Sequence, residues 1–436
     1  MQTSLRGIAT KAKQHKKYKF GNLYGLIDRQ ALYQAWADIN KKAAAGVDKV
    51  TAKEFAQNLD QNLGELLISL KQKKYKAKLV RRTNIPKGGG KTRPLGIPTI
   101  KDKILQRAVA RILEAIYEQD FLKCSYGYRP GTGPQKAVQE LTKEIQGKYS
   151  YIVEADIKGF FNNIDHQWLM EMLKQRIKDS TFLRLINKWL KAGILETDGK
   201  VIHPITGCPQ GAIVSPILAN IYLHYVLDLW FEKIVKPKCQ GEAYLCRFAD
   251  DYICAFRYKA DAQRVYKELP GRLKKFGLEL AMEKTKIISF SRFRKHENTR
   301  FEFLGLEYRW KVSHKGKDII ARRTSRKKLR KSIKAFTEWC KKNRNNRLRK
   351  IVDMLNAKLR GYFNYYGVIG NSKGIKEFYK IALKILYKWL NRRSQRKSFN
   401  WKEFETKMKW YGLIKPRITE KPNNQLQIEW KEKCFA

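Results

Sequence analysis

The feature that most constrains this chain is a pair of adjacent acids, Asp250 and Asp251, set between two short apolar runs within residues 244–256. Both runs favour β-structure, so the segment predicts a tight hairpin with the acids at its bend. Adjacent carboxylates repel each other, and a divalent metal ion or nearby lysine and arginine side chains would offset that repulsion. Taken alone, the doublet is compatible with a solvated turn as well as with a metal site.

A third acid favours the metal site over the solvated turn. Asp156 lies near the end of an apolar, β-branched run that begins at Tyr151 and predicts a buried strand. Three carboxylates that meet at neighbouring strand ends can hold two metal ions, an arrangement suited to phosphoryl or nucleotidyl transfer. One Mg²⁺ would lower the pKa of an attacking hydroxyl, and the other would neutralise a leaving pyrophosphate.

The charge of the chain points to a polyanionic partner. Its 436 residues include 92 Lys and Arg against 40 Asp and Glu, a net charge of +52, and the length allows two or three domains. Nucleic acid is the natural candidate, because neutralised phosphates release counterions and drive binding. No apolar run is long enough to span a membrane, and no secretory signal opens the chain. We therefore expect an intracellular protein, in a bacterial cytoplasm, with no membrane partner.

The cysteines and histidines indicate no metal cluster. None of the seven cysteines forms a CxxC pair, and the six histidines are scattered, which argues against a zinc ribbon or a disulfide framework. His166 follows Asp165, a predicted N-cap of a helix that carries Leu169, Leu173 and Ile177. We interpret His166 as structural or solvated rather than as a metal ligand.

The N-terminal third predicts helices followed by a basic hairpin. Residues 1–20 are rich in lysine and fit either a basic arm that orders on nucleic acid or a frayed terminus. Residues 23–70 predict helices that are interrupted by a turn at 45–48. Residues 74–98 predict two strands around a glycine loop, either a basic flap that closes over a triphosphate or an ordinary solvated hairpin.

The middle of the chain predicts a helix and two loops. A helix is expected from Lys101 to Tyr117, followed by a loop rich in turn residues at 125–134. The stretch Pro209-Gln210-Gly211 precedes a long apolar helix. The free backbone N–H groups at the start of that helix could receive a phosphate or a template sugar.

A strongly basic helical region follows. Residues 321–360 hold sixteen Lys and Arg against two acids, above an apolar stripe at helical spacing. A solvated charged helix is the alternative, but so one-sided a surface would repel itself without a polyanion. The predicted stripe is Leu329, Ile333, Phe336 and Cys340, and the predicted nucleic-acid-binding residues are Arg326, Lys327, Arg330 and Lys334.

In their order and spacing, several motifs resemble those of a reverse transcriptase. These are Asp156 to Phe161, Pro209-Gln210-Gly211, Phe248-Ala249-Asp250-Asp251, Glu283-Lys284-Thr285 and Phe303-Leu304-Gly305. Further sequence motifs narrow the resemblance to group II intron-encoded reverse transcriptase/maturases. This resemblance extends over roughly residues 20 to 415. They are Gly46-Val47-Asp48, residues 85–98, 125–130 and 215–221, and the late run 359–366.

The resemblance implies an α+β, right-hand polymerase of fingers, palm and thumb. Its implied activity is RNA-directed DNA synthesis from dNTPs on an RNA template and a DNA primer or target, together with binding of group II intron RNA to assist splicing. The alternatives are a domesticated reverse transcriptase with a defence or repair role, a splicing-only maturase and an RNA-copying RNA polymerase. The expected divisions are 1–75 for a basic, helical extension, 76–310 for fingers and palm, 311–395 for the thumb or maturase domain, and 396–436 for a short basic end.

The resemblance also implies roles for individual residues. Asp156, Asp250 and Asp251 fall on a triad that binds two Mg²⁺ ions, for which Mn²⁺ can substitute, and the backbone of Ile157 contributes a further ligand. Phe161 falls on the residue that packs beneath the sugar and excludes a 2′-hydroxyl. The other implied roles are a grip on the incoming triphosphate for Arg81, Lys87 and Arg93, contact with the nucleotide sugar or template base for Gln210, and protonation of pyrophosphate for Lys284. From sequence alone, Lys284 fits a solvated loop charge equally well.

The chain departs from the family pattern at several positions. Phe248 stands where tyrosine is usual, which removes a hydroxyl and predicts altered primer contact or fidelity. Ala212 replaces a frequent glycine, and Ala281 lies where asparagine is common. An HNH endonuclease uses paired cysteines and histidines as metal ligands, but the C-terminal end after Trp410 holds only Cys434, and no histidine follows His314. We therefore expect a form without that nuclease, which primes insertion from an existing nick or fork.

Overall fold

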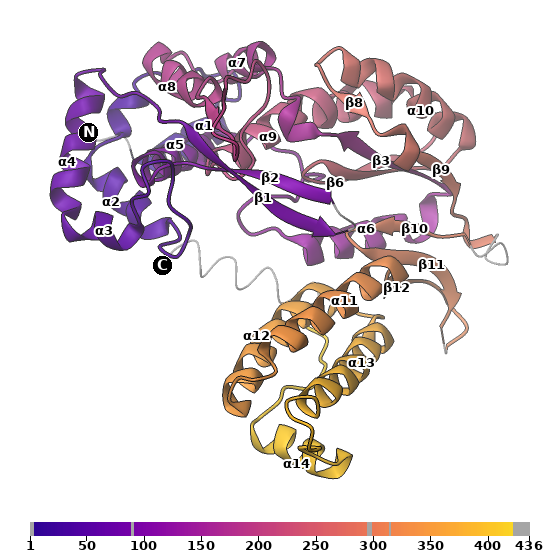
Figure 1. Cartoon of the computed structure of the whole chain (residues 1–436). Helices are drawn as coiled ribbons and strands as arrows, with labels where there is room; N and C mark the ends of the chain where they lie inside the picture. The colour runs from indigo at the N-terminus through magenta and orange to yellow at the C-terminus, as the bar shows by residue number, and fades with distance from the viewer. Residues whose placement is uncertain (1–3, 89–90, 294–298, 314, 422–436) are drawn as a thin grey trace.

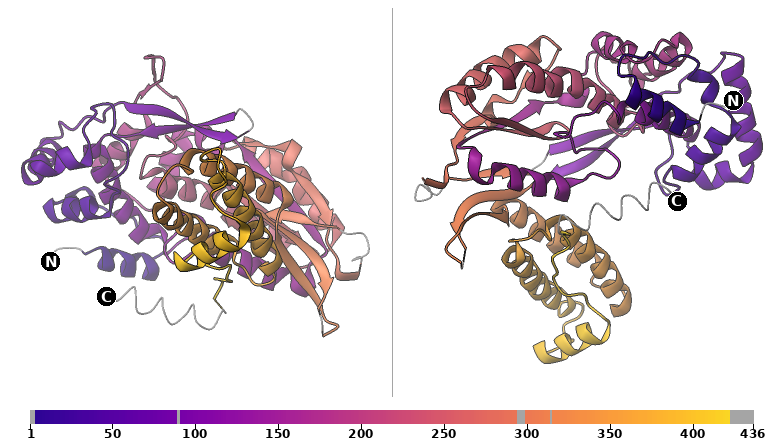
Figure 2. Two further views of the ribbon diagram at one scale, coloured as in Figure 1. Left: turned by 60° about the horizontal axis from the view of Figure 1, so that its bottom comes forward. Right: turned by 180° about the vertical axis from the view of Figure 1, so that it is seen from behind.

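The computed structural model describes residues 4–88, 91–293, 299–313 and 315–421. Figure 1 shows a group of helices at the N-terminal end, a central region around the largest sheet, and a helical body below it. In the right view of Figure 2 this last body stands apart from the rest, and the chain enters it through β11 (Leu306–Val312) and β12 (Asp318–Thr324). The chain therefore has the mixed helix and sheet architecture that was expected.

The first described residues fold into a packed helix. Ser4 caps α1 (Leu5–Gln14), and Ile8 and Ala12 are buried where α1 contacts α5 (Ile100–Tyr117). Two apolar residues four positions apart are sufficient to give a short helix a buried face. The expectation of a basic arm or a frayed terminus is therefore wrong for this segment.

The next helices divide at the predicted turn. Thr51 begins the helix after the turn through a capping box, in which the Glu54 carboxylate accepts a hydrogen bond from the Thr51 amide at 2.8 Å. The predicted helix from Lys101 corresponds to α5. The elements before it are η1 (Tyr24–Leu26), α2 (Arg29–Asp38), α3 (Ala52–Gln57) and α4 (Leu59–Lys71).

The basic hairpin is present and belongs to a four-stranded sheet. β1 (Val80–Gly88) pairs antiparallel with β2 (Lys91–Ile97), and the strand order is β2-β1-β4-β5 with β4 (Ile194–Leu195) and β5 (Val201–Ile202). The Gly96 amide on β2 donates a hydrogen bond to the Gln210 carbonyl at 2.6 Å. This contact joins the hairpin to the Pro-Gln-Gly loop.

The largest sheet is built around β3 (Tyr151–Lys158). This strand pairs antiparallel with β7 (Asp251–Phe256) on one side and with β8 (Glu279–Leu280) and β9 (Lys286–Ser289) on the other. The strand β6 (Ala243–Phe248) pairs with β7 at the edge. Ile152, Val153, Ala155 and Ile157 of β3 are buried, as the apolar run predicted. The sheet is therefore the rigid support on which the acidic residues stand.

Helices cover both faces of this sheet. On one face α6 (Pro134–Lys148) shares a core with β10 (Phe301–Phe303) and β11, and on the other the main core includes α9 (Ser215–Leu223) and α10 (Lys259–Lys274). The remaining elements here are η2 (Phe160–Asn162), α7 (His166–Lys174), α8 (Ser180–Leu190), η3 (His224–Asp228), η4 (Phe231–Val235), η5 (Lys236–Lys238) and η6 (Met282–Lys284).

The helix after Asp165 is shorter than expected. Asp165 caps α7 through the Trp168 amide at 2.9 Å, and Leu169 and Leu173 are buried as predicted. Ile177 lies beyond the end of α7, which is a correction to the predicted helix. The structural interpretation of His166 is confirmed, because this buried ring places Nε2 2.8 Å from the Gly207 carbonyl oxygen.

The lower body consists of a small sheet and a group of helices. Strands β10, β11 and β12 form that sheet, and Phe336 and Cys340 of the predicted stripe are buried in the helical core while Leu329 and Ile333 pack against it. Each fully buried large apolar side chain contributes roughly 1.5–3 kcal/mol to such a core. The helices are α11 (Arg326–Asn343), α12 (Leu348–Tyr366), α13 (Ser372–Leu390) and α14 (Trp401–Trp410).

The last described residues return to the junction between this body and the large sheet. Arg322 on β12 and Glu420 form a buried pair with two hydrogen bonds of 2.9 Å, and Gln135 of α6 donates to the Thr419 hydroxyl at 3.0 Å. These contacts tie the C-terminal segment to both bodies. No helix within the described ranges is both long and apolar enough to cross a bilayer.

Candidate active site

The acidic doublet lies at the bend of the predicted hairpin. Phe248 at the end of β6 pairs with Asp251 at the start of β7, so Ala249 and Asp250 form the two-residue turn between them. Ala249 has a φ of 56°, in the left-handed region that L-residues seldom adopt. The turn therefore projects Asp250 and Asp251 from the end of a rigid ribbon.

The third acid meets this hairpin directly. In the antiparallel pairing of β3 with β7, Asp156 is the residue opposite Asp251. Side chains opposite each other on paired strands lie on one face, within about 4.5–5.5 Å at their Cβ atoms. The pairing thus places Asp156 beside the strand end that carries Asp250 and Asp251, about ninety residues later in the sequence.

Lys284 provides a positive charge at this point. Its ammonium group forms an ion pair with the Asp156 carboxylate, and this hydrogen bond raises the pKa of Lys284. The backbone supports the contact, because the Ala281 amide donates to the Asp156 carbonyl at 2.8 Å and the Lys284 amide to the Ala281 carbonyl at 3.0 Å. Lys284 is nevertheless largely solvated, with 61% of its side chain exposed, so it is an exposed charge that is also paired with Asp156.

Burial and like charge act on Asp251. Burial, followed by the neighbouring charges of Asp156, Asp250 and Glu154, raises the pKa of Asp251 to about 7, against a hydrogen bond from the Leu304 amide that lowers it. The sheet thus concentrates more negative charge than it neutralises. Such an excess is what a bound cation relieves.

The carboxylate set fits divalent metal ions in its chemistry. Mg²⁺ and Mn²⁺ prefer carboxylate oxygens, and these acids have both the surplus charge and the partial exposure that an ion requires. Among the residues that the structure describes, no three Asp, Glu, His or Cys side chains are gathered as metal ligands would be. The ion pair with the Lys284 ammonium partly offsets the negative charge at Asp156.

The other residues expected beside the acids have defined neighbours in the structure. Ile157 follows Asp156 on β3, where its backbone pairs with Leu280 and its side chain enters the main core. Phe161 is partly buried, and its carbonyl accepts a hydrogen bond from the Cys208 amide at 2.8 Å. Gln210 lies two residues after Cys208. The backbone of the aromatic residue is therefore joined to the segment that leads into the Pro-Gln-Gly loop.

The hairpin cations have different surroundings. Arg81 and Arg93 lie on one face, because Arg93 pairs with Ile85 and Arg81 lies four residues before Ile85 on β1. Arg93 is exposed, whereas Arg81 donates to the Ala45 carbonyl from Nε at 3.1 Å and from Nη2 at 2.6 Å. The Arg81 guanidinium thus holds the turn at residues 45–48. Lys87 belongs to β1, but its side chain lies outside the described part of the structure.

The basic helix of the lower body lines a cavity together with residues of the large sheet. Arg326, Lys327 and Arg330 are exposed on the first turns of α11 and line a cavity of about 810 Å³ together with Glu154 and Lys284. Glu154 lies two residues before Asp156 on the same face of β3. Lys334, one turn beyond Arg330, is also exposed. The basic surface therefore begins next to the acidic strand ends.

Two features of the site were missed by sequence reasoning. Arg247, one residue before Phe248, is completely buried and hydrogen-bonded to the turn that carries Asp250. Tyr128 is exposed, has a φ of 57°, and lies near Asp250, whose charge contributes to raising the pKa of this phenol after burial. The presence of an arginine within the apolar run of β6 could have indicated the buried role of Arg247. Nothing in the sequence indicated that Tyr128 lies near Asp250.

We expect the Asp251→Asn substitution to stabilise the metal-free protein at alkaline pH. Since the folded-state pKa of about 7 lies above the ordinary value, the wild-type carboxyl favours folding below pH 4 and loses that contribution as pH rises to 7. Asparagine keeps the acceptor for Leu304 without the charge. Thermal unfolding in EDTA should show a gain of about 1–3 kcal/mol at pH 8 and little at pH 4.

The matched control for this experiment is Asp198→Asn, in an exposed turn where Asp198 accepts a hydrogen bond from the Lys200 amide. It should give no such pH-dependent gain. A destabilised Asp251→Asn protein at pH 8 would contradict the electrostatic account.

Comparison with known proteins agrees with this geometry. Residues 85–308 match the reverse transcriptase (RNA-dependent DNA polymerase) family, and residues 322–408 match the group II intron maturase-specific domain. The first match contains the three acids, and the second contains the basic face of α11. In sequence order the two matches correspond to the large sheet with its hairpin and to the helical body.

Individual relatives extend the match along the chain. The group II intron-encoded protein LtrA of Lactococcus lactis subsp. cremoris is 30% identical over 462 aligned residues, which cover 86% of this chain and 75% of LtrA. Protein YkfC of Escherichia coli is 30% identical, with 67% of this chain and 83% of YkfC covered. Telomerase from Candida albicans is 14% identical with a TM-score of 0.44, over 82% of this chain and 71% of that one, too loose a likeness to equate residues. On the family matches and the similarity to LtrA, this chain belongs to the group II intron-encoded reverse transcriptase/maturases.

Proposed function

We propose that this reverse transcriptase joins dNTPs to a DNA primer on an RNA template at Asp156, Asp250 and Asp251, and that its basic helical body binds group II intron RNA. The observation that carries the proposal is the pairing of Asp156 with Asp251 beside the Asp250 turn. It supports a shared site, because the sheet fixes the acids before any substrate is bound. We also infer that the protein acts inside the cell, in a bacterial cytoplasm.

In this proposal the three acids and the Ile157 carbonyl hold two Mg²⁺ ions, for which Mn²⁺ can substitute. The bound ions supply Lewis acidity, which lowers the pKa of the primer hydroxyl and neutralises charge on the pyrophosphate. The protein contributes the fixed strand ends and the cation next to them. Lys284, released from Asp156 when metal binds, is then positioned to donate its proton to the leaving pyrophosphate.

The nucleotide is held from three sides. Lys87 and Arg93 on the hairpin contact the triphosphate, and Arg81 joins them only if it leaves the Ala45 carbonyl. Phe161 packs beneath the sugar, and Gln210 contacts the sugar or the template base. The hydrogen bond from the Cys208 amide to the Phe161 carbonyl supports this arrangement, because it makes both residues part of one rigid surface.

In this proposal the body around the large sheet carries out nucleotidyl transfer, and the lower helical body binds nucleic acid. We assign residues 1–75 to a helical extension, 76–310 to fingers and palm, 311–395 to the thumb or maturase domain, and 396–436 to a short basic end. Arg326, Lys327, Arg330 and Lys334 bind the phosphate backbone of the intron RNA or of the template–primer duplex. The cavity that Arg326, Lys327 and Arg330 share with Glu154 and Lys284 supports a path from the thumb toward Asp156, the ion-pair partner of Lys284.

Primer extension tests the enzymatic part of this proposal. On a primed RNA template with Mg²⁺, the wild-type protein should incorporate dNTPs and reject rNTPs. Incorporation of rNTPs at an equal rate would instead indicate an RNA-copying RNA polymerase. No incorporation of either nucleotide, with RNA binding retained, would indicate a splicing-only maturase.

The Phe161→Ala substitution should relax sugar selection. Removal of the ring creates space for a 2′-hydroxyl, so the ratio of dNTP to rNTP incorporation should fall by about 10- to 100-fold, on the order of 1.4–2.8 kcal/mol of discrimination. Substitution of Phe160, whose ring is buried next to Phe161, by leucine serves as the control for packing. An unchanged ratio in a folded Phe161→Ala protein would remove Phe161 from the nucleotide site.

A further inference from the structure

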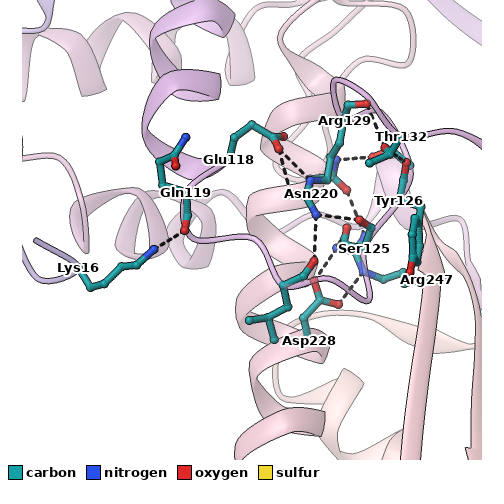
Figure 3. Close-up of polar contacts among 12 residues, drawn as sticks. Lys16, Glu118, Gln119, Ser125, Tyr126, Arg129, Thr132, Asn220, Asp228 and Arg247 are labelled. Carbon is teal, nitrogen blue, oxygen red and sulfur yellow. Dashed lines mark hydrogen bonds and ion pairs between the residues drawn. The ribbon is translucent and has the colours of Figure 1, made fainter. Parts of the chain in front are cut away.

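A buried arginine lies directly behind the acidic turn. Arg247, on β6, is completely inaccessible to solvent, yet its guanidinium group makes five hydrogen bonds to side chains and backbone from different segments (Figure 3). They are Nε to Asp228 Oδ1 at 2.7 Å, Nη2 to Asp228 Oδ2 at 2.6 Å, Nη2 to Ser125 Oγ at 2.7 Å, Nη1 to Asn220 Oδ1 at 3.1 Å and Nη1 to the Ala249 carbonyl at 3.0 Å.

One of these hydrogen bonds acts on the turn itself. The Ala249 carbonyl belongs to the residue that immediately precedes Asp250, and Ala249 has the unfavourable positive φ. A residue in this conformation needs its neighbours to hold it there. Arg247 supplies that restraint from the interior, because its own position is fixed by the bidentate pair with Asp228.

The turn is restrained from its other side by the loop at residues 125–134. A Cβ atom placed on Gly127 would lie 2.3 Å from the Ala249 nitrogen, so only glycine permits this approach. Asn220 joins the two restraints, since its amide donates to the Gly127 carbonyl at 2.7 Å while its oxygen accepts from Arg247. The backbone of the turn is thus clamped between the loop and the guanidinium group.

The contacts distinguish a positioning role from simple stabilisation. The ion pair with Asp228 alone would satisfy the buried charge, and a well-packed apolar pair could often replace it without loss of stability. The contact with Ala249 is different, because no apolar replacement can donate to that carbonyl. Partners outside the ligand shell that orient a ligand typically change metal affinity by about 10- to 100-fold when they are removed.

We infer that Arg247, fixed by Asp228 and Asn220, is a positioning residue that sets the direction of the Asp250 carboxylate and thereby the affinity of the site for divalent metal. The inference rests on the proposed role of Asp250 as a metal ligand. Its effect reaches the metal only through the backbone of Ala249.

Two changes at Arg247 test the inference. Arg247→Lys keeps the buried positive charge opposite Asp228 but lacks the planar fork that reaches Ala249. The pair Arg247→Met with Asp228→Leu removes both charges, so it should fold while it loses the donor to the turn. The matched control pair is Arg176→Met with Asp120→Leu, since Arg176 is buried, is paired with Asp120 at 2.9 Å and is bonded to carbonyls near the N-terminus.

The primary readout is Mn²⁺ binding to the full chain without nucleotide, measured from the electron paramagnetic resonance signal of free Mn²⁺. Both Arg247 variants should bind Mn²⁺ about 10-fold or more weakly and require correspondingly more Mg²⁺ for primer extension, while the control pair binds like the wild type. Thermal unfolding identifies which proteins are folded. Wild-type Mn²⁺ affinity in either folded Arg247 variant would overturn the inference.

A reference variant separates this inference from the proposed function. If Asp250→Asn binds Mn²⁺ as tightly as the wild type, the assignment of Asp250 as a ligand fails, and the positioning role fails with it. If Asp250→Asn loses affinity while the folded Arg247 variants do not, the proposed function stands and only the positioning role is excluded. A loss in the control pair as large as that in the Arg247 variants would attribute the effect to general destabilisation and also overturn the inference.

Discussion

Substitution of Asp250 by asparagine is expected to reduce RNA-templated DNA synthesis by about 10³-fold or more while RNA binding stays nearly unchanged. Asparagine has almost the same shape as aspartate, but it lacks the negative charge that holds a divalent ion. Asp250 lies in a two-residue turn and is partly exposed, so its charge is not part of the hydrophobic core. The loss should therefore be confined to catalysis.

Two measurements on one protein preparation separate the activities. Primer extension reports catalysis, and filter binding or fluorescence anisotropy with intron RNA reports affinity. Splicing assistance should follow the affinity, because the basic surface of the thumb does not depend on the acids. The control is Asp198→Asn, which should affect neither. An equal loss of synthesis and RNA binding in folded Asp250→Asn protein would contradict the separation of functions.

The second large effect is expected in the thumb. Replacing Arg326, Lys327 and Arg330 together by glutamine should weaken RNA binding by about 10- to 100-fold at physiological salt. A phosphate that the variant no longer neutralises retains its condensed counterions, so binding releases fewer of them. The slope of log affinity against log salt concentration should therefore become shallower, by up to about 2–3.

A charge-matched variant shows whether position or total charge is responsible. Lys267, Lys274 and Lys275 are exposed at α10, on the face of the large sheet opposite α6. Their replacement by glutamine changes the net charge equally and should leave the salt slope almost unaltered. Equal weakening by both triple variants would indicate that the overall charge of +52 drives binding and that α11 has no special place.

The sequence predicted those parts of the fold that local patterns determine. The hairpin around Asp250 and the strand that carries Asp156 follow from short apolar, β-favouring runs, and both are confirmed. The apolar stripe of α11 is confirmed for the same reason. Such patterns suffice because alternation and helical spacing specify which side of an element is buried.

Other features depend on contacts between segments that are distant in sequence. The packing of Ile8 and Ala12 on α5 could not be read from a segment with few apolar residues and with lysines at 11, 13, 16, 17 and 19. The ion pair between Lys284 and Asp156 joins residues 128 positions apart. The five hydrogen bonds of Arg247 likewise need α9, η3 and the loop at 125–134 to assemble around one strand. In each case the tertiary partner, not the local sequence, decides the role.

The most direct test of the central claim is to locate Mn²⁺ by anomalous scattering in a crystal of the protein with an RNA template, a DNA primer and an unreactive dNTP analogue. We expect ions about 2.1 Å from carboxylate oxygens of Asp156, Asp250 and Asp251, with the Lys284 ammonium displaced from Asp156. Mn²⁺ bound elsewhere, with these carboxylates free of metal and Lys284 still paired to Asp156, would contradict the assignment of the active site.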